Sequence, residues 1–211
     1  MTIEVFLADD HAVMRAGLRL LLEAQPDLRV IGEAANGREA VRQAQIKCPD
    51  VLIMDIAMAE LNGIEATRQI CALCPDTRVL VLSMYSTEEY VARALHAGAL
   101  GYVLKEAAGA DVIDAVRAVY AGRQYFSPKI AAAHSYSRRA GISPLQSLSE
   151  REREILQLIV EGHSSAHIGG ILNLSPKTVE TYRSRLMHKL DLHDLPGLVK
   201  FAIQHGLTSL E

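Results

Sequence analysis

Several features are scarce or absent in the sequence, and each excludes a class of protein. No apolar run approaches the ~20 residues that a membrane-spanning helix needs, and the N-terminus lacks the apolar segment of a signal peptide. The chain has only three cysteines, and a low, odd number does not support a disulfide framework. We therefore expect a cytoplasmic protein with no membrane association.

Two of the cysteines, Cys71 and Cys74, have the C-x-x-C spacing of zinc and redox sites. No second C-x-x-C or H-x-x-H pair supplies the remaining ligands of a zinc site. We therefore expect both cysteines near the end of a helix, with one side chain facing inward and the other outward.

An excess of basic charge is also missing, since the net charge is −3. Residues 1–122 hold 11 basic and 17 acidic side chains, residues 123–147 hold four basic and no acidic ones, and residues 148–211 hold seven and eight. Nucleic-acid-binding proteins are usually more basic than this. Any surface that binds DNA must therefore concentrate its positive charge in one place.

The first 122 residues alternate short apolar runs with longer amphipathic stretches. We expect strands at 3–7, 30–33, 51–54, 79–82 and 102–104, and helices at 14–24, 38–46, 65–72, 88–97 and 111–121. Five βα units with strands that are apolar on both sides predict an α/β, doubly wound, five-stranded parallel sheet.

The remainder of the chain has a different pattern. Residues 123–147 contain two Ser-Pro pairs and predict a linker, whose pattern is compatible with a short helix near 130–135. Residues 148–211 predict a small all-α domain of four helices at 150–161, 166–172, 176–190 and 195–205. Ser149 and Glu152 have the spacing of a capping box at the start of the first of these helices.

Polar side chains follow four of the predicted strands. Asp9 and Asp10 follow the first strand, Asp55 the third, Ser83 the fourth and Lys105 the fifth. Such sheets bind ligands beyond the carboxyl ends of their strands. Three clustered carboxylates need a cation, and oxygen ligands suit Mg²⁺ or Mn²⁺. With a lysine and a hydroxyl for phosphoryl oxygens, the set predicts phosphoryl transfer to an aspartate.

These residues, together with Met58, Gly63 and Tyr102, resemble the flavodoxin-like receiver domain of two-component response regulators over residues 1–122. The resemblance implies that a sensor histidine kinase phosphorylates Asp55. It implies that Mg²⁺ is bound by Asp9, Asp10, Asp55 and the backbone carbonyl of Ala57. It also implies that Ser83 and Tyr102 form a switch pair and that Lys105 holds the phosphoryl group.

Three further positions affect these expectations: Ala57 and Ala59, shortly after Asp55, and Tyr85, two residues after Ser83. Ala59 stands where the family usually has proline, and we expect a modest effect on loop order without loss of phosphorylation. Ala57 and Tyr85 occupy positions that help to align the hydrolytic water in receivers, and neither carries a carboxylate or carboxamide. We therefore expect a long-lived phosphorylated state, which autodephosphorylation within seconds would refute.

The helix predicted at 176–190 has one apolar and one polar face. Val179, Tyr182, Leu186 and Leu190 recur at three- and four-residue spacing, which is typical of a core stripe. The opposite face and its flanks provide the basic charge that the segment as a whole lacks. Pro176 suits the first turn and Ser175 suits the N-cap, whose exposed amides could meet a phosphate.

The segment 148–211 resembles the helix-turn-helix of the LuxR/FixJ (NarL-type) family, through Leu148–Glu152, Glu161-Gly162, Thr178–Thr181 and Lys189-Leu190. The resemblance implies that the third helix enters the major groove of double-stranded DNA and that the fourth supports a homodimer. On this helix we expect base-edge contacts from Lys177, Thr181 and Ser184, and phosphate contacts from Arg183, Arg185 and Lys189, with Thr178 in the same DNA-binding set. Glu180 either accepts from cytosine or holds Arg183 or Ser184 in place.

The second of these helices departs from the family pattern. Gly169 and Gly170 cost roughly 1 kcal/mol each against alanine in a short helix. Ala166 stands where relatives usually place a residue that can grip the DNA backbone. We expect low intrinsic affinity for DNA, with phosphorylation-driven dimerisation supplying the rest.

The sequence therefore predicts a transcription factor, not an enzyme, in which phosphorylation of Asp55 controls dimerisation and sequence-specific binding at promoters. One alternative is a stand-alone phosphotransfer enzyme. Another is a phosphate-independent DNA-binding regulator with a vestigial receiver, which Ala59 leaves open. A ligand-sensing regulator has no support, since the N-terminal half has an acidic rim instead of an apolar pocket.

Overall fold

The computed structural model describes residues 2–134, 144–205 and 207. The chain divides into two compact units, Met1–Ala140 and Gly141–Glu211, each considered by itself below. The segment 135–143, which includes Arg138 and Arg139 of the predicted linker, lies outside the described residues. No described helix has the length and apolar character that crossing a membrane requires.

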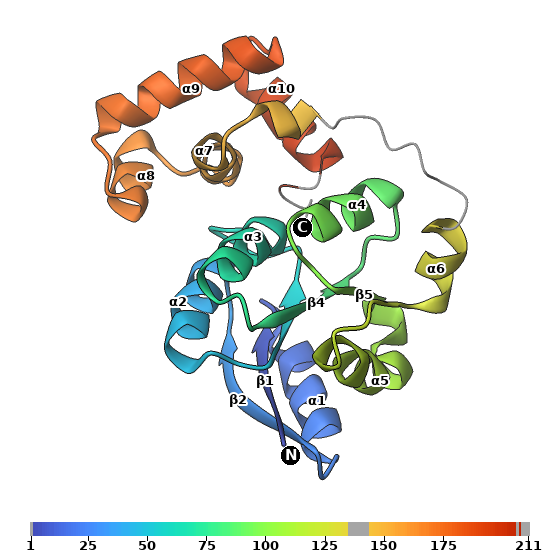
Figure 1. Cartoon of the computed structure of the whole chain (residues 1–211). Coiled ribbons are helices and arrows are strands. Elements are labelled where there is room, and N and C mark those ends of the chain that lie inside the picture. The colour runs from blue at the N-terminus through green and yellow to red at the C-terminus, as the bar shows by residue number, and fades with distance from the viewer. Residues whose placement is uncertain (1, 135–143, 206, 208–211) are drawn as a thin grey trace. The chain divides into compact units, whose positions relative to one another are not determined.

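The first unit is built on a parallel sheet of six strands in the order β2-β1-β3-β4-β5-β6 (Figure 1). The strands are β1 Ile3–Ala8, β2 Leu28–Ala34, β3 Val51–Asp55, β4 Arg78–Ser83, β5 Gly101–Leu104 and β6 Tyr125–Phe126. The predicted doubly wound parallel sheet is confirmed, with one strand more than the five expected. β6 lies in the segment that we interpreted as linker, and two residues are too few to leave a periodic pattern.

Helices cover both faces of this sheet. They are α1 Ala12–Glu23, α2 Gly37–Lys47, α3 Gly63–Leu73, α4 Glu88–His96 and α5 Ala108–Tyr120, followed by the short α6 Pro128–His134. Alternate strand residues enter two different cores: Val5 and Leu7 pack with residues of α1 and α5, whereas Phe6 and Ala8 pack with residues of α2, α3 and α4. This two-sided burial explains why the strands are apolar throughout.

The cysteine prediction is only partly correct. Cys74, the C-cap of α3, is buried as one of the pair was expected to be. Cys71 does not face outward: it is half-buried, and its Sγ lies 3.5 Å from the carbonyl oxygen of Gly98.

The second unit contains α7 Glu150–Val160, α8 Ser165–Leu172, α9 Pro176–Leu190 and α10 Leu195–Gln204, preceded by a short 3-10 helix at Pro144–Ser147. Its core includes Ile155, Leu158, Val179, Leu186 and Leu198. The predicted capping box is present, since the Ser149 side chain accepts the N–H of Glu152 and the Glu152 side chain accepts the N–H of Ser149. Each of the four predicted helices is confirmed to within two residues.

Candidate functional site

The polar side chains that follow the strands meet at one edge of the sheet. Asp55 and Ser83 are the last residues of β3 and β4, while Asp9 and Lys105 directly follow β1 and β5. These four strands are adjacent and parallel, so their carboxyl ends share an edge. β1 and β3 are also the pair between which the chain changes direction across the sheet, which is where ligands bind in this architecture.

Lys105 is the centre of the acidic cluster. Its Nζ lies 2.6 Å from Oδ2 of Asp55 and 2.8 Å from Oδ2 of Asp9. Both aspartates are only 2% exposed, so these are ion pairs largely screened from solvent. Asp10 is more accessible, and its Oδ1 lies 2.7 Å from Nδ1 of His11.

The cluster can hold a divalent cation. One ligand atom from each of Asp9, Asp10, His11 and Asp55 lies within 4.8 Å of the other three. Carboxylate oxygens are the ligands that hard divalent cations prefer, and imidazole is compatible with several transition-metal ions. His11 was not among the predicted site residues, although its place directly after Asp10 was a signal for it.

Burial and like charge dominate the electrostatics of Asp55. Removal from water, followed by the charge of Asp9, raises the pKa of Asp55 to about 6, although Lys105 opposes the shift. Burial alone would lower the pKa of Lys105, but Asp55 and Asp9 outweigh it, so this pKa lies above its usual value. The carboxylates of Asp9, Asp10 and Asp55 outnumber the single amine of Lys105, and a bound cation would offset this excess of negative charge.

The predicted switch residues are joined through Tyr85. The Oγ of Ser83 accepts the N–H of Tyr85 at 3.0 Å, and the hydroxyl of Tyr102 donates to the Tyr85 carbonyl at 2.7 Å. Ser83 and Tyr102 are fully buried, and burial raises the pKa of Tyr102 above its usual range. The Tyr85 ring stacks on Tyr90 of α4, with centroids 4.2 Å apart. Tyr85 therefore links Ser83 and Tyr102 to α4.

The start of α3 packs directly against the backbone of Asp55. A Cβ on Gly63 would lie 1.8 Å from the Asp55 carbonyl oxygen, so no larger residue fits there. The N–H of Gly63 donates to the carbonyl of Ile56 at 2.9 Å, and the N–H of Ala57 lies 3.4 Å from Oδ1 of Asp55. Ala59 is exposed in this loop, and the next residue, Glu60, has a left-handed φ of 65°. The effect of Ala59 on loop order stays a prediction.

In the second unit, α9 exposes the face that the sequence predicted. Val179 and Leu186 are buried, whereas Lys177, Thr181 and Ser184 are exposed on the opposite side. Ser175 caps the helix by accepting the N–H of Thr178 at 3.1 Å. The helix thus presents hydroxyl and amino groups at its amino-terminal half, suited to hydrogen bonding with an external polar surface.

Comparison with known proteins finds a matching family for each of the two parts of the chain. Residues 5–117 match the response regulator receiver domain, and residues 146–202 match the luxR family of bacterial regulatory proteins. The chain belongs to the LuxR-type response regulators. It is 40% identical to the response regulator UvrY of Escherichia coli over 212 residues, covering 99% of this chain and 97% of that protein.

Solved structures of other response regulators have the same fold. A LuxR-family regulator from Aurantimonas is 36% identical with a TM-score of 0.62, and the match covers 65% of this chain and all of that one. A structure of RcsB dimers bound to DNA is 25% identical with a TM-score of 0.62, and the match covers 97% of this chain and 99% of that one. This response regulator therefore has a receiver and a DNA-binding domain, and the stand-alone enzyme is excluded.

The two glycines of α8 in this response regulator have different environments. A Cβ on Gly169 would lie 2.6 Å from the carbonyl oxygen of Leu174, so this glycine allows the turn before α9 to approach α8. A Cβ on Gly170 would meet nothing within 4 Å. Of the two glycines, only Gly170 could therefore be replaced by alanine without a clash, and this replacement should stabilise the helix.

Several predicted DNA-binding side chains of the response regulator already have partners within the domain. Thr178 Oγ1 lies 2.8 Å from Ser175 Oγ, and Thr181 Oγ1 donates to the carbonyl of Lys177 at 3.0 Å. Lys189 is paired with Glu152 of α7 at 2.8 Å. Arg183 is half-buried, while Arg185 is exposed.

Glu180 contacts neither Arg183 nor Ser184 among the described residues, although the sequence suggested both as partners within the domain. Its carboxylate accepts a hydrogen bond from the Ser165 hydroxyl of α8. This contact and the Lys189–Glu152 pair were missed because each joins residues of different helices.

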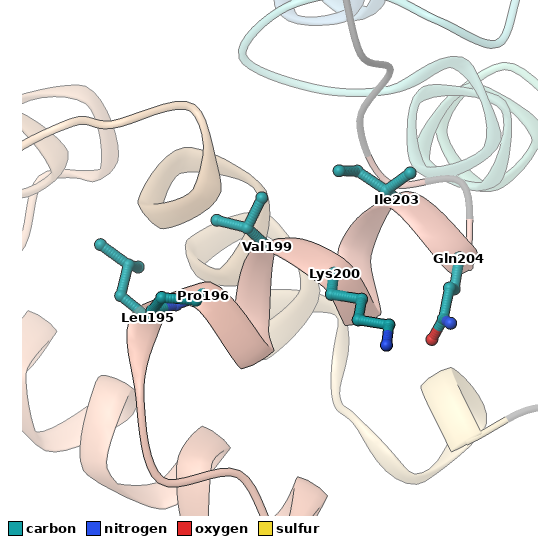
Figure 2. Close-up of a pocket in the computed structure, with 6 residues that line it drawn as sticks. All are labelled: Leu195, Pro196, Val199, Lys200, Ile203 and Gln204. Atoms are coloured by element: carbon teal, nitrogen blue, oxygen red, sulfur yellow. The ribbon is translucent and has the colours of Figure 1, made fainter.

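The last helix exposes an apolar groove. Leu195, Pro196, Val199, Lys200, Ile203 and Gln204 line it, and Figure 2 shows Leu195, Val199 and Ile203 succeeding one another along α10. Leu195 is 41% exposed and contributes apolar surface to this groove.

Proposed function

We propose that this response regulator acts in the cytoplasm and accepts a phosphoryl group on Asp55 from a sensor histidine kinase. The observation that carries the proposal is the buried Asp55 carboxylate, held 2.6 Å from Lys105 within a group of further carboxylates at one edge of the sheet. Burial of several like charges costs free energy, so such a cluster is a poor means of stabilising a fold. A site that accepts a phosphoryl group needs these carboxylates.

In this reaction an Asp55 oxygen forms the new P–O bond, and the P–N bond to the imidazole of the donor breaks. Asp9, Asp10, Asp55 and the Ala57 carbonyl would hold Mg²⁺ or Mn²⁺, which supplies positive charge to the phosphoryl oxygens. Lys105 exchanges its contact with the Asp55 carboxylate for one with the phosphoryl group. Ser83 provides a hydroxyl for another phosphoryl oxygen.

The signal then passes through the switch pair. Reorientation of Ser83 toward the phosphoryl group disturbs its contact with Tyr85, to which Tyr102 is also bonded. Phosphorylation thereby favours one of two receiver surfaces, as a population shift requires. The favoured form dimerises, and the exposed apolar groove of α10 is suited to packing against its copy in a second chain.

The dimer binds double-stranded promoter DNA through α9, with half-sites about one helical turn apart. Lys177, Thr181 and Ser184 are the candidates for base edges, and Arg183 and Arg185 for phosphates. Thr178 supports them from its contact with Ser175. Alanine at Thr181 or Ser184 should relax sequence preference without changing the salt dependence of binding, which would be measured by selection from a random duplex pool.

The phosphorylation step is tested by incubating the full chain with acetyl phosphate and Mg²⁺ and measuring its intact mass. Wild type should gain one phosphoryl group per chain, and Asp55→Asn should gain none. Size-exclusion chromatography should then show a larger species only for the phosphorylated chain. Absence of the mass increase in wild type would favour the phosphate-independent regulator instead.

A further inference from the structure

The last turn of α9 is tied to the first turn of α7 by an ion pair between Lys189 and Glu152. The Nζ of Lys189 lies 2.8 Å from Oε2 of Glu152, and the same oxygen accepts the N–H of Ser149 at 2.8 Å. The side chain of Glu152 is 6% exposed and that of Lys189 is 43% exposed. The capping box therefore fixes the carboxylate in place, and Lys189 is the partner that reaches it from the surface.

The carboxylate depends on this partner. Burial by itself would raise the pKa of Glu152, but the hydrogen bonds from Lys189 and Ser149 lower this pKa below its usual range. A buried carboxylate that loses its cation is strongly unfavourable. If Lys189 turned to a DNA phosphate, it would leave Glu152 in that state. Arg185 is exposed on the same helix and serves as a comparison.

The Lys189–Glu152 pair and a second polar contact join α9 to neighbouring helices. Toward its amino-terminal end, Glu180 accepts from Ser165 of α8, and toward its carboxyl-terminal end, Lys189 donates to Glu152 of α7. Residues 180 and 189 are separated by roughly 13 Å along a helix at 1.5 Å per residue. Two separated contacts to two different helices fix the direction of a helix, which apolar packing leaves freer to rotate or slide.

We propose that Lys189 is a positioning residue, which sets the orientation of α9 through Glu152 and does not neutralise a DNA phosphate. The inference rests on the proposed function, in which α9 enters DNA, and it replaces the phosphate contact that the sequence suggested for Lys189. Binding to DNA then depends on Lys189 through the alignment of the other side chains of α9. If Lys189 binds a phosphate, loss of the Glu152 carboxylate should strengthen DNA binding or leave it unchanged. If Lys189 positions α9, the same loss should weaken DNA binding.

The test compares Glu152→Gln, Lys189→Met, the double variant and the control Arg185→Met in the full chain. Affinity is measured by fluorescence anisotropy, over a range of KCl concentrations, for a duplex that wild type selects from a random-sequence pool in the presence of acetyl phosphate and Mg²⁺. Glutamine at position 152 can still complete the capping box, so Glu152→Gln should fold even if Lys189→Met does not. Circular dichroism of each variant checks this.

If Lys189 positions α9, Glu152→Gln and Lys189→Met each weaken binding, by roughly three- to tenfold, and the double variant is no weaker than either. The slope of log affinity against log salt stays at the wild-type value in all three, whereas Arg185→Met reduces it by about 0.9, the loss of one phosphate contact. The inference is overturned if Glu152→Gln strengthens or does not change binding, or if Lys189→Met reduces the slope as Arg185→Met does. If wild type enriches no duplex at all, the proposed function itself fails.

Discussion

The charge on Asp55 should make the metal-free protein less stable at neutral pH than at mildly acidic pH. The pKa of this carboxyl rises from 3.8 to about 6 in the folded state. The folded chain therefore binds this proton more tightly than the unfolded chain, so the contribution to stability is present below about pH 4 and is lost as pH rises through about 6. At 1.36 kcal/mol per pKa unit, the loss is about 3 kcal/mol.

Asp55→Asn removes this penalty, because asparagine has no proton to lose. In the presence of EDTA, the variant should exceed wild type in unfolding free energy by up to about 3 kcal/mol at pH 7.5, and by almost nothing near pH 4. Wild type contains no tryptophan, so unfolding is followed by far-ultraviolet circular dichroism and by calorimetry, which resolves the two units. Addition of Mg²⁺ at neutral pH should close most of the gap by stabilising wild type.

A matched control is Asp76→Asn, which removes an exposed carboxylate. This variant should show no pH-dependent gain. If Asp55→Asn is no more stable than wild type at neutral pH, or is equally stabilised at pH 4 and pH 7.5, the electrostatic account of the pocket is wrong.

Four further substitutions follow from the surroundings described above. Lys105→Met leaves two buried carboxylates without their cation and should lower stability by about 3 kcal/mol in EDTA and by less in Mg²⁺, as thermal unfolding would show. Gly170→Ala should stabilise the second unit by roughly 1 kcal/mol, whereas Gly169→Ala should destabilise it; equal effects in calorimetry would contradict the difference in their surroundings. Tyr102→Phe leaves the Tyr85 carbonyl without its hydroxyl partner and should cost about 1 kcal/mol in urea unfolding, with no loss of phosphorylation by acetyl phosphate.

Much of the fold could be predicted because its patterns are local. The apolar runs of β1, β3, β4 and β5 end at polar residues. Because the carboxyl ends of parallel strands lie at one edge of the sheet, the proximity of these residues could be predicted from the sequence alone. The four helices of the second unit carry caps and periodic apolar positions. The Ser-x-x-Glu spacing of Ser149 and Glu152 was enough to place the start of α7 at residue 150.

What could not be predicted depends on contacts between distant segments. β6 owes its existence to pairing with β5, and nothing in Tyr125–Phe126 distinguishes it from a loop. The position of His11 directly after Asp10 was a signal, but the direction of its side chain, which brings it into the acidic cluster, is not given by the sequence. The sequence does not distinguish Lys189 from the other basic residues of its helix, because its buried partner Glu152 lies on a different helix.

The contact between Gly63 and the Asp55 carbonyl has a consequence for how such proteins can diversify. Asp55, the proposed phosphoryl acceptor, packs through its carbonyl against the Cα of Gly63, so the distance between β3 and α3 cannot be changed by exchanging side chains there. Under the proposed function, we expect the lifetime of the phosphorylated state to vary instead through residues such as those at positions 57 and 85. The contact at Gly63 would then keep the reacting geometry constant among relatives that differ in how long the phosphorylated state lasts.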